Sequence, residues 1–170
     1  IATAMQIFMQ KPLKCIYNTT LQANGRCIGK TEIQTEVNMQ RFAIGIEFCG
    51  VSYKGWQTQQ PGVPSVQETL EKVLSKIANE PVAVHGAGRT DAGVHARGAV
   101  AHVDVDPLSW EALPGRSSRP PQEAAASRLR GVLPPDIVVR SVAPAPPGFD
   151  ARFSATSRRY TYTLCDRPAA

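Results

Sequence analysis

Two apolar runs flank a glycine-punctuated loop in the middle of the chain, and this arrangement most restricts the possible fold. Residues 82–84 precede the loop and residues 99–103 follow it, and both runs are typical of buried strands. Gly88 and Gly93 lie in the loop, where glycine permits a positive φ or a close approach of the backbone to a ligand. The segment therefore predicts two strands joined by a loop that can carry a functional site.

A carboxylate and a guanidinium lie close together in this loop. Asp91 follows Arg89 after one intervening residue, and a nearby opposite charge favours the ionised form of an acid. A guanidinium can also hold a carboxylate or a phosphate through two donors. By itself an R-x-D pair is more often a solvated ion pair beside a turn, which contributes little. We expect an ion pair here, and a candidate active site only where further motifs support it.

Periodicity in the rest of the chain predicts an α+β fold. Apolar residues alternate over residues 41–48, as on a strand covered on one side. Ser65 and Glu68 form a capping box before apolar residues at helical spacing, and Asn79 ends that pattern. The expected order is strand 41–48, helix 65–79, strands 82–84 and 99–106, an irregular segment at 107–122, helix 121–129, and strands 136–142 and 158–164. The first six elements have the β-α-β-β-α-β order of a ferredoxin-like or RRM-like unit, with an antiparallel sheet and helices on one face, and strand 158–164 follows them.

Several separate motifs resemble those of one enzyme family. The decapeptide AGRTDAGVHA at residues 87–96 resembles the active-site signature of the TruA-type tRNA pseudouridine synthases. Further family-like motifs occur on both sides of it, in the same order as in the family. FAIGIEF at 42–48 and YKGWQ at 53–57 precede the decapeptide, and LPPDI at 133–137, FDARFSAT at 149–156 and RRY at 158–160 come after it. The resemblance covers about residues 41–170. It implies an isomerase that converts uridine to pseudouridine at positions 38–40 of the tRNA anticodon stem-loop, as a homodimer without cofactor or metal.

The resemblance also assigns roles to two loop residues. Asp91 matches the essential aspartate of the family, which could attack C1′ of the sugar, attack the base, or remove a sugar proton. Arg89 is expected to pair with Asp91 and to fill the space that a flipped-out uridine leaves. His95, at the end of the signature, is expected to line the site without acid–base work.

Residues after the signature are carried over in the same way. Tyr160 matches a tyrosine whose ring packs on the target base, because an unstacked base needs a new aromatic partner. Without the motif, it would be a core residue of an alternating strand. Arg152, Arg158 and Arg159 precede it, and the resemblance favours contact with tRNA phosphates over a merely solvated basic face.

The resemblance divides the chain into two parts. Residues 1–38 lie outside it, and we expect a disordered or artefactual extension with Met39 as the natural start. Residues 39–170 are expected to form the N-terminal half of a synthase catalytic domain, since members of the family are substantially longer. Two positions depart from the family pattern: Cys49 stands where an acidic residue is usual, and Arg130 stands where asparagine is common.

Composition agrees with a polyanionic partner. The formal net charge is +5 and the sequence pI about 9.2, a mild basic bias that permits nucleic-acid binding. The four cysteines include no C-x-x-C pair, so no zinc site is indicated, and we expect reduced thiols in a cytoplasmic protein. No apolar run is long enough to span a membrane.

Two other functional classes fit parts of the sequence. One is a non-catalytic RNA-binding module or an inactive fragment of a synthase, although strands 41–48 and 99–106 lack the exposed aromatic motifs of an RRM. The other is a carboxylate hydrolase such as a glycosidase, which needs two positioned acids. Asp104 and Asp106 are available, but they end an alternating strand, where we expect them to be solvated.

Four ring-bearing residues have open or structural interpretations. Tyr53 and Trp56 lie in a Gly-, Pro- and Gln-rich loop, where the rings either pin the loop to the core or contact RNA. His85 and His102 lie in or beside strands, and we expect structural roles for both.

Overall fold

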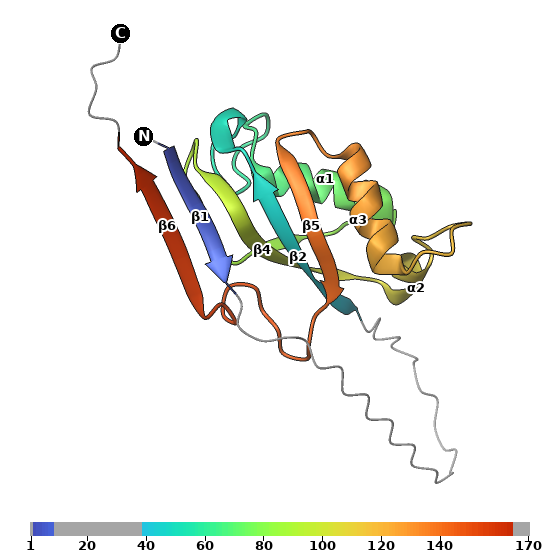
Figure 1. Cartoon of the computed structure of the whole chain (residues 1–170). Helices are drawn as coiled ribbons and strands as arrows, with labels where there is room; N and C mark the ends of the chain where they lie inside the picture. Colours follow the sequence, from blue (N-terminus) through green and yellow to red (C-terminus); the bar gives the residue numbers. More distant parts are fainter. Residues whose placement is uncertain (1, 9–38, 165–170) are drawn as a thin grey trace, which may run out of the picture.

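The structure is a computed structural model that describes residues 2–8 and 39–164. These residues form a single sheet with helices packed on one face (Figure 1). The elements are β1 (Ala2–Phe8), β2 (Gln40–Phe48), a 3-10 turn (Gly50–Ser52), α1 (Val66–Ala78), β3 (Val84–Gly86), β4 (His95–Val105), α2 (Pro107–Glu111), α3 (Pro121–Val132), β5 (Ile137–Pro144) and β6 (Ser157–Thr163). Within this part of the chain, no helix has the length and apolarity to cross a bilayer.

Strand β2 lies at the centre of an antiparallel unit. It pairs antiparallel with β5 on one side and with β4 on the other. The far edge of β4 is shared, because β3 pairs with residues 101–103 and β1 pairs with residues 95–98. Residues 40–144 therefore form a β-α-β-β-α-β unit, and the predicted α+β, ferredoxin-like fold is confirmed.

Strand β1 extends this sheet beyond the expected unit. It runs parallel to β4 and antiparallel to β6, which forms the edge. Residues 2–8 belong to the segment expected to be a disordered or artefactual extension, yet they pair along a strand. The rest of that segment, residues 1 and 9–38, lies outside the described residues.

The core lies between the sheet and helices α1 and α3, which Figure 1 shows on the same face. Phe42, Ile44 and Ile46 alternate along β2 and are each at most 1% exposed, and Leu70 of α1 and Leu129 of α3 are equally buried against them. The alternation of β2 thus points one row of side chains at the helices. The intervening residues of the strand lie on the opposite, open face of the sheet.

The predicted boundaries of α1 are confirmed. Ser65 is the N-cap, and its hydroxyl accepts a hydrogen bond from the backbone N–H of Glu68 at 3.2 Å. Asn79 closes the helix in the left-handed conformation, with φ 57°. These local signals fix the position of α1 in the sequence and leave its apolar stripe facing the sheet.

The prediction of irregular structure at 107–122 is wrong for its first residues, which form α2. Asp106 caps this helix by accepting from the N–H of Ser109 at 3.2 Å, and Pro107 occupies the first turn, where its missing N–H has no cost. Trp110 then stacks on Phe42 with the ring centroids 3.5 Å apart. The segment is helical because a cap, a proline and a buried ring support it together.

Candidate active site

The signature loop is shorter than expected. Strand β4 begins at His95, so the loop between β3 and β4 comprises residues 87–94. His95 is therefore the first residue of a strand and is not among the residues that line the pocket described below. The expectation that it lines the site stays a prediction.

A second loop crosses the open face of the sheet and supports the signature loop. Arg41 on β2 accepts the N–H of Ala145 at its carbonyl, 2.8 Å away, and donates from Nη1 to the carbonyl of Phe149 at 2.7 Å. The N–H of Ala151 donates to Nδ1 of His102 on β4 at 3.0 Å. Residues 145–156, here called the crossing loop, are thus attached to two strands of the sheet.

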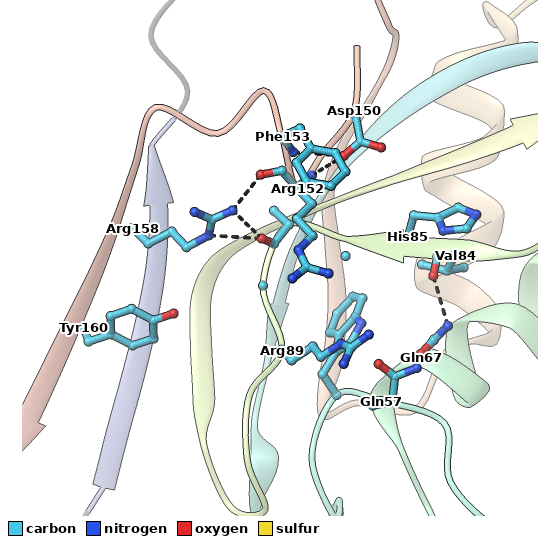
Figure 2. Close-up of a pocket in the computed structure, with 14 residues that line it drawn as sticks. Gln57, Gln67, Val84, His85, Arg89, Asp150, Arg152, Phe153, Arg158 and Tyr160 are labelled. Carbon is cyan, nitrogen blue, oxygen red and sulfur yellow. Dashed lines mark hydrogen bonds between the residues drawn. The ribbon is translucent and has the colours of Figure 1, made fainter. Parts of the chain in front are cut away.

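The two loops and β6 enclose a pocket of about 510 Å³. Four of the seven residues predicted for the site line it: Arg89, Arg152, Arg158 and Tyr160. Figure 2 shows them arriving from three separate segments, with Tyr160 on β6 across the pocket from Gln57 and Gln67. The fold therefore brings together residues far apart in the sequence, such as Arg158 and Ala87, which are 71 positions apart and form a hydrogen bond.

Asp91 lies outside this pocket, at the exposed part of the signature loop. Its carbonyl accepts the N–H of Val94 at 3.2 Å, which closes a tight turn. The expected ion pair between Arg89 and Asp91 is wrong, since no such pair is found among the described residues. Arg89 extends into the pocket (Figure 2), whereas Asp91 starts the turn beside it. Spacing in the sequence does not decide side-chain direction in an irregular loop.

The backbone of the signature loop is held from below by the segment that follows β2. The N–H of Trp56 donates to the carbonyl of Thr90 at 2.9 Å, and the N–H of Gly93 donates to the carbonyl of Tyr53 at 3.3 Å. A Cβ at Gly55, whose φ is +108°, would lie 2.6 Å from the Thr90 oxygen. Glycine is required here because two backbone segments are in direct contact.

The two rings of this segment are buried, which confirms that they pin it to the core. Tyr53 and Trp56 belong to the main apolar cluster, and Trp56 also forms part of the pocket wall. The hydroxyl of Tyr53 donates to Asp136 Oδ1 at 2.8 Å. Burial, followed by this hydrogen bond, raises the pKa of Tyr53 to about 12. The ring is therefore a fixed, neutral anchor below the site.

Arg158 connects the two loops. Its Nε and Nη2 donate to the carbonyl of Ala87 at 3.0 and 2.8 Å, and Nη2 also donates to the carbonyl of Arg152 at 2.7 Å (Figure 2). Much of the donor capacity of this guanidinium is thus used within the protein. Tyr160 lies two positions along β6 on the same face and is 45% exposed, whereas Arg159 lies on the other face and does not line the pocket.

The pocket also contains residues that the sequence did not single out for the site. His85 was expected to be structural, yet it lines the pocket with its ring 4.8 Å from that of His102. Phe153 is 83% exposed, and the guanidinium of Arg152 lies 5.8 Å from its ring centre. The position of His85 follows from strand pairing, because β3 aligns it opposite His102 on β4. This pairing would have been the indication that the two rings lie together. Phe153 belongs to the FDARFSAT motif but had no assigned role.

The acids near the pocket are engaged in structure. Asp150 Oδ1 accepts the N–H groups of Arg152 and Phe153 at 2.8 and 3.0 Å, and these bonds, that of Phe153 first, lower the pKa of Asp150. Asp104 binds Arg41 through both oxygens at 2.7 Å, which lowers the pKa of Asp104. Asp104 and Asp106 are both partly exposed, but one is paired with Arg41 and the other caps α2, so a two-acid hydrolase site has no support.

The charge of the pocket is set by arginines. Among the described residues, the guanidinium groups of Arg89 and Arg152 make no hydrogen bond or ion pair, so their donors face the pocket. No group of three or more His, Cys, Asp or Glu side chains suited to a metal ion is found in the same residues. Free guanidinium donors beside the exposed rings of Tyr160 and Phe153 can bind phosphates and stack on bases, so the arrangement suits a nucleic acid.

Comparison with known proteins agrees with this geometry. Residues 44–154 match the tRNA pseudouridine synthase family. The chain is 52% identical over 134 residues to tRNA pseudouridine synthase A of Acinetobacter baylyi, covering 77% of this chain and 45% of that protein. The chain is also similar to the proteins of the same name from Aeromonas hydrophila (51% identical over 132 residues) and Acinetobacter baumannii (50% identical over 130 residues). Each of these matches covers 76% of this chain and 45% of the relative. The chain thus spans less than half the length of these relatives, and it belongs to the tRNA pseudouridine synthase family.

Proposed function

We propose that this chain supplies the aspartate-bearing part of an enzyme that isomerises uridine to pseudouridine in tRNA, at positions 38–40 of the anticodon stem-loop. The observation that carries the proposal is the position of Asp91, exposed on a backbone-anchored loop directly beside the arginine-lined pocket. An exposed carboxylate next to free guanidinium donors combines a reactive group with a means of holding the RNA.

The reaction exchanges one glycosidic bond for another. The N1–C1′ bond breaks, the base rotates, and a C5–C1′ bond forms, while the C5 proton leaves and N1 gains a proton. Asp91 acts on the sugar or the base in the first step, so its carboxylate is essential by each of the three routes open to it. No redox change or external group is needed, and the proposal includes neither a cofactor nor a metal.

The pocket residues divide the binding work. Arg89 and Arg152 have free guanidinium donors that bind phosphates, and their side chains can fill the space that a flipped base vacates. Tyr160 presents a half-exposed ring on which the extruded uracil stacks. Arg158 keeps the two loops together and contacts RNA only through its remaining donors. Arg159, on the other face of β6, contacts the RNA backbone outside the pocket.

The test uses a chimera, because relatives are about twice as long as this chain. Residues 39–170 replace the matching part of the Acinetobacter baylyi protein, and tritium release is measured from tRNA labelled at uridine C5. We expect release from the chimera, none from its Asp91→Asn variant, and unchanged release from Glu111→Gln, which alters an exposed acid on α2.

RNA binding separates this proposal from a non-catalytic module. The Asp91→Asn chimera is expected to bind an anticodon stem-loop as tightly as the parent while releasing no tritium. Equal release from both proteins, or silence from a folded and dimeric parent chimera on tRNA that bears uridine at 38–40, would refute the assignment. The homodimer of the family is part of the proposal, and sedimentation of the chimera tests it.

A further inference from the structure

His102 is buried beneath the crossing loop on the open face of the sheet and is 3% exposed. Its Nδ1 accepts the N–H of Ala151 at 3.0 Å. Its Nε2 lies 4.0 Å from Oδ2 of Asp150. An imidazole that accepts through Nδ1 is neutral and carries its proton on Nε2. One ring therefore faces two successive residues of the crossing loop, with an acceptor toward one and a donor toward the other.

Asp150, the neighbour of the bonded Ala151, determines the shape of the loop beyond it. Asp150 accepts the N–H groups of Arg152 and Phe153, and its carbonyl accepts the N–H of Ser154 at 2.8 Å. Asp150 thus forms the turn from which the side chains of Arg152 and Phe153 enter the pocket (Figure 2). A displacement of Asp150 moves the pocket wall with it.

We propose that His102 is a positioning residue for the pocket: its neutral ring holds the backbone of Ala151 on the sheet, beside Asp150, and so directs Arg152 and Phe153 toward bound RNA. The inference deepens the proposed function and rests on it for its RNA readout. His102 itself touches neither the pocket nor the reacting atoms, since it is absent from the pocket lining.

The charges around His102 favour the neutral ring. Burial first, and then Arg41 on β2, lower its pKa from the ordinary 6.5, with His85 on β3 acting in the same direction. Asp150 on the crossing loop and Asp104 on β4 oppose this shift. A proton on Nδ1 would turn an acceptor into a donor facing the N–H of Ala151. Because two donors cannot bond, protonation breaks the attachment at Ala151 and loosens this part of the loop, while the bonds of Arg41 to Ala145 and Phe149 remain.

Hydrogen exchange of the Ala151 amide reads this attachment without RNA. The 170-residue chain is compared with its His102→Leu and His102→Asn variants, since asparagine keeps a side-chain acceptor and leucine does not. We expect exchange at Ala151 to rise on the order of 10-fold in His102→Leu and to stay near the parent rate in His102→Asn. The amide of Ile44, in the core strand, is the control and keeps its rate in both variants unless the whole domain is destabilised.

The pH profile gives a readout that a merely structural residue would not change. Corrected for the intrinsic rate, exchange at Ala151 is expected to rise in the parent chain as the pH falls from about 7.5 to about 5.5, and to stay flat in His102→Asn. In the chimera described above, binding of an anticodon stem-loop RNA should weaken in His102→Leu and recover in His102→Asn. Equal Ala151 exchange in the parent and His102→Leu, or an identical pH profile in His102→Asn, overturns the inference. If exchange at Ala151 rises in His102→Leu as expected but neither the parent nor any variant binds the RNA, the proposed function is rejected and the attachment of the loop by His102 is still supported.

Discussion

Replacement of Gly55 by alanine tests whether the segment after β2 sets the backbone position of the signature loop. Gly55 has a φ of +108°, and a Cβ there would lie 2.6 Å from the carbonyl oxygen of Thr90 and 3.4 Å from the carbonyl carbon of Asp91. The nearest atom is backbone, so no side-chain rotation relieves the contact. Either the segment after β2 or the signature loop must move.

Two costs add in this variant. A non-glycine residue at this φ costs about 1–3 kcal/mol in backbone strain. The contact with Thr90 adds a further 1–3 kcal/mol or so, the usual cost of overpacking. Gly62→Ala is the matched control, because Gly62 also has a positive φ, +87°, but its Cβ would meet nothing within 4 Å. The difference between the two variants therefore isolates the contact.

Urea denaturation followed by tryptophan fluorescence measures both losses of unfolding free energy. We expect Gly55→Ala to lose at least about 1 kcal/mol more than Gly62→Ala, which corresponds to a further 2–4 °C in Tm for a chain of this size. In the chimera, tritium release should fall in Gly55→Ala and persist in Gly62→Ala. Equal stability losses with equal tritium release would refute the argument that Gly55 supports the loop.

Two further predictions concern the layers below the site. Tyr53→Phe is expected to cost about 0.5–1.5 kcal/mol at neutral pH, because the bond to Asp136 is lost. Since the pKa of Tyr53 is raised from 10.0 to about 12, the parent should lose stability as the pH rises from 10 to 12, and urea titrations across that range should show a smaller loss in the variant. Trp110→Ala is expected to cost about 3–5 kcal/mol, whereas Leu108→Ala on the same helix, where the side chain is 80% exposed, should stay within about 0.5 kcal/mol in the same assay; similar losses would contradict the packing of α2.

The elements of the fold were predictable where the signal is local. Alternation along residues 41–48 and the cap at Ser65 depend only on neighbours in the sequence, so strand and helix were placed to within a residue or two. The helix at 107–111 was missed because the prolines of residues 107–122 suggested irregular structure, although Asp106 before Pro107 is itself a start signal. The stabilising contact, Trp110 on Phe42, joins residues far apart in the sequence and could not be read from it.

The candidate site was predictable only as a set of residues. The motifs indicated Arg89, Arg152, Arg158 and Tyr160, and the structure brings these four to one pocket. Their interactions depend on the path of the crossing loop over the sheet, which no local pattern encodes. For this reason the expected partner of Arg89 was wrong, and the bond of Arg158 to Ala87 was not anticipated.

The main core and the crossing loop lie on opposite faces of one sheet, which lets stability and binding vary separately at the loop. The helix face buries large side chains such as Ile44, whereas the crossing loop buries only a small cluster of Ala87, Phe149 and Ala151. The loop is therefore held mainly by polar bonds, each worth about 0.5–1.5 kcal/mol net. A few such bonds can open while the sheet stays folded. Substitutions at the polar attachments of the crossing loop are therefore expected to alter RNA binding before they alter the unfolding transition.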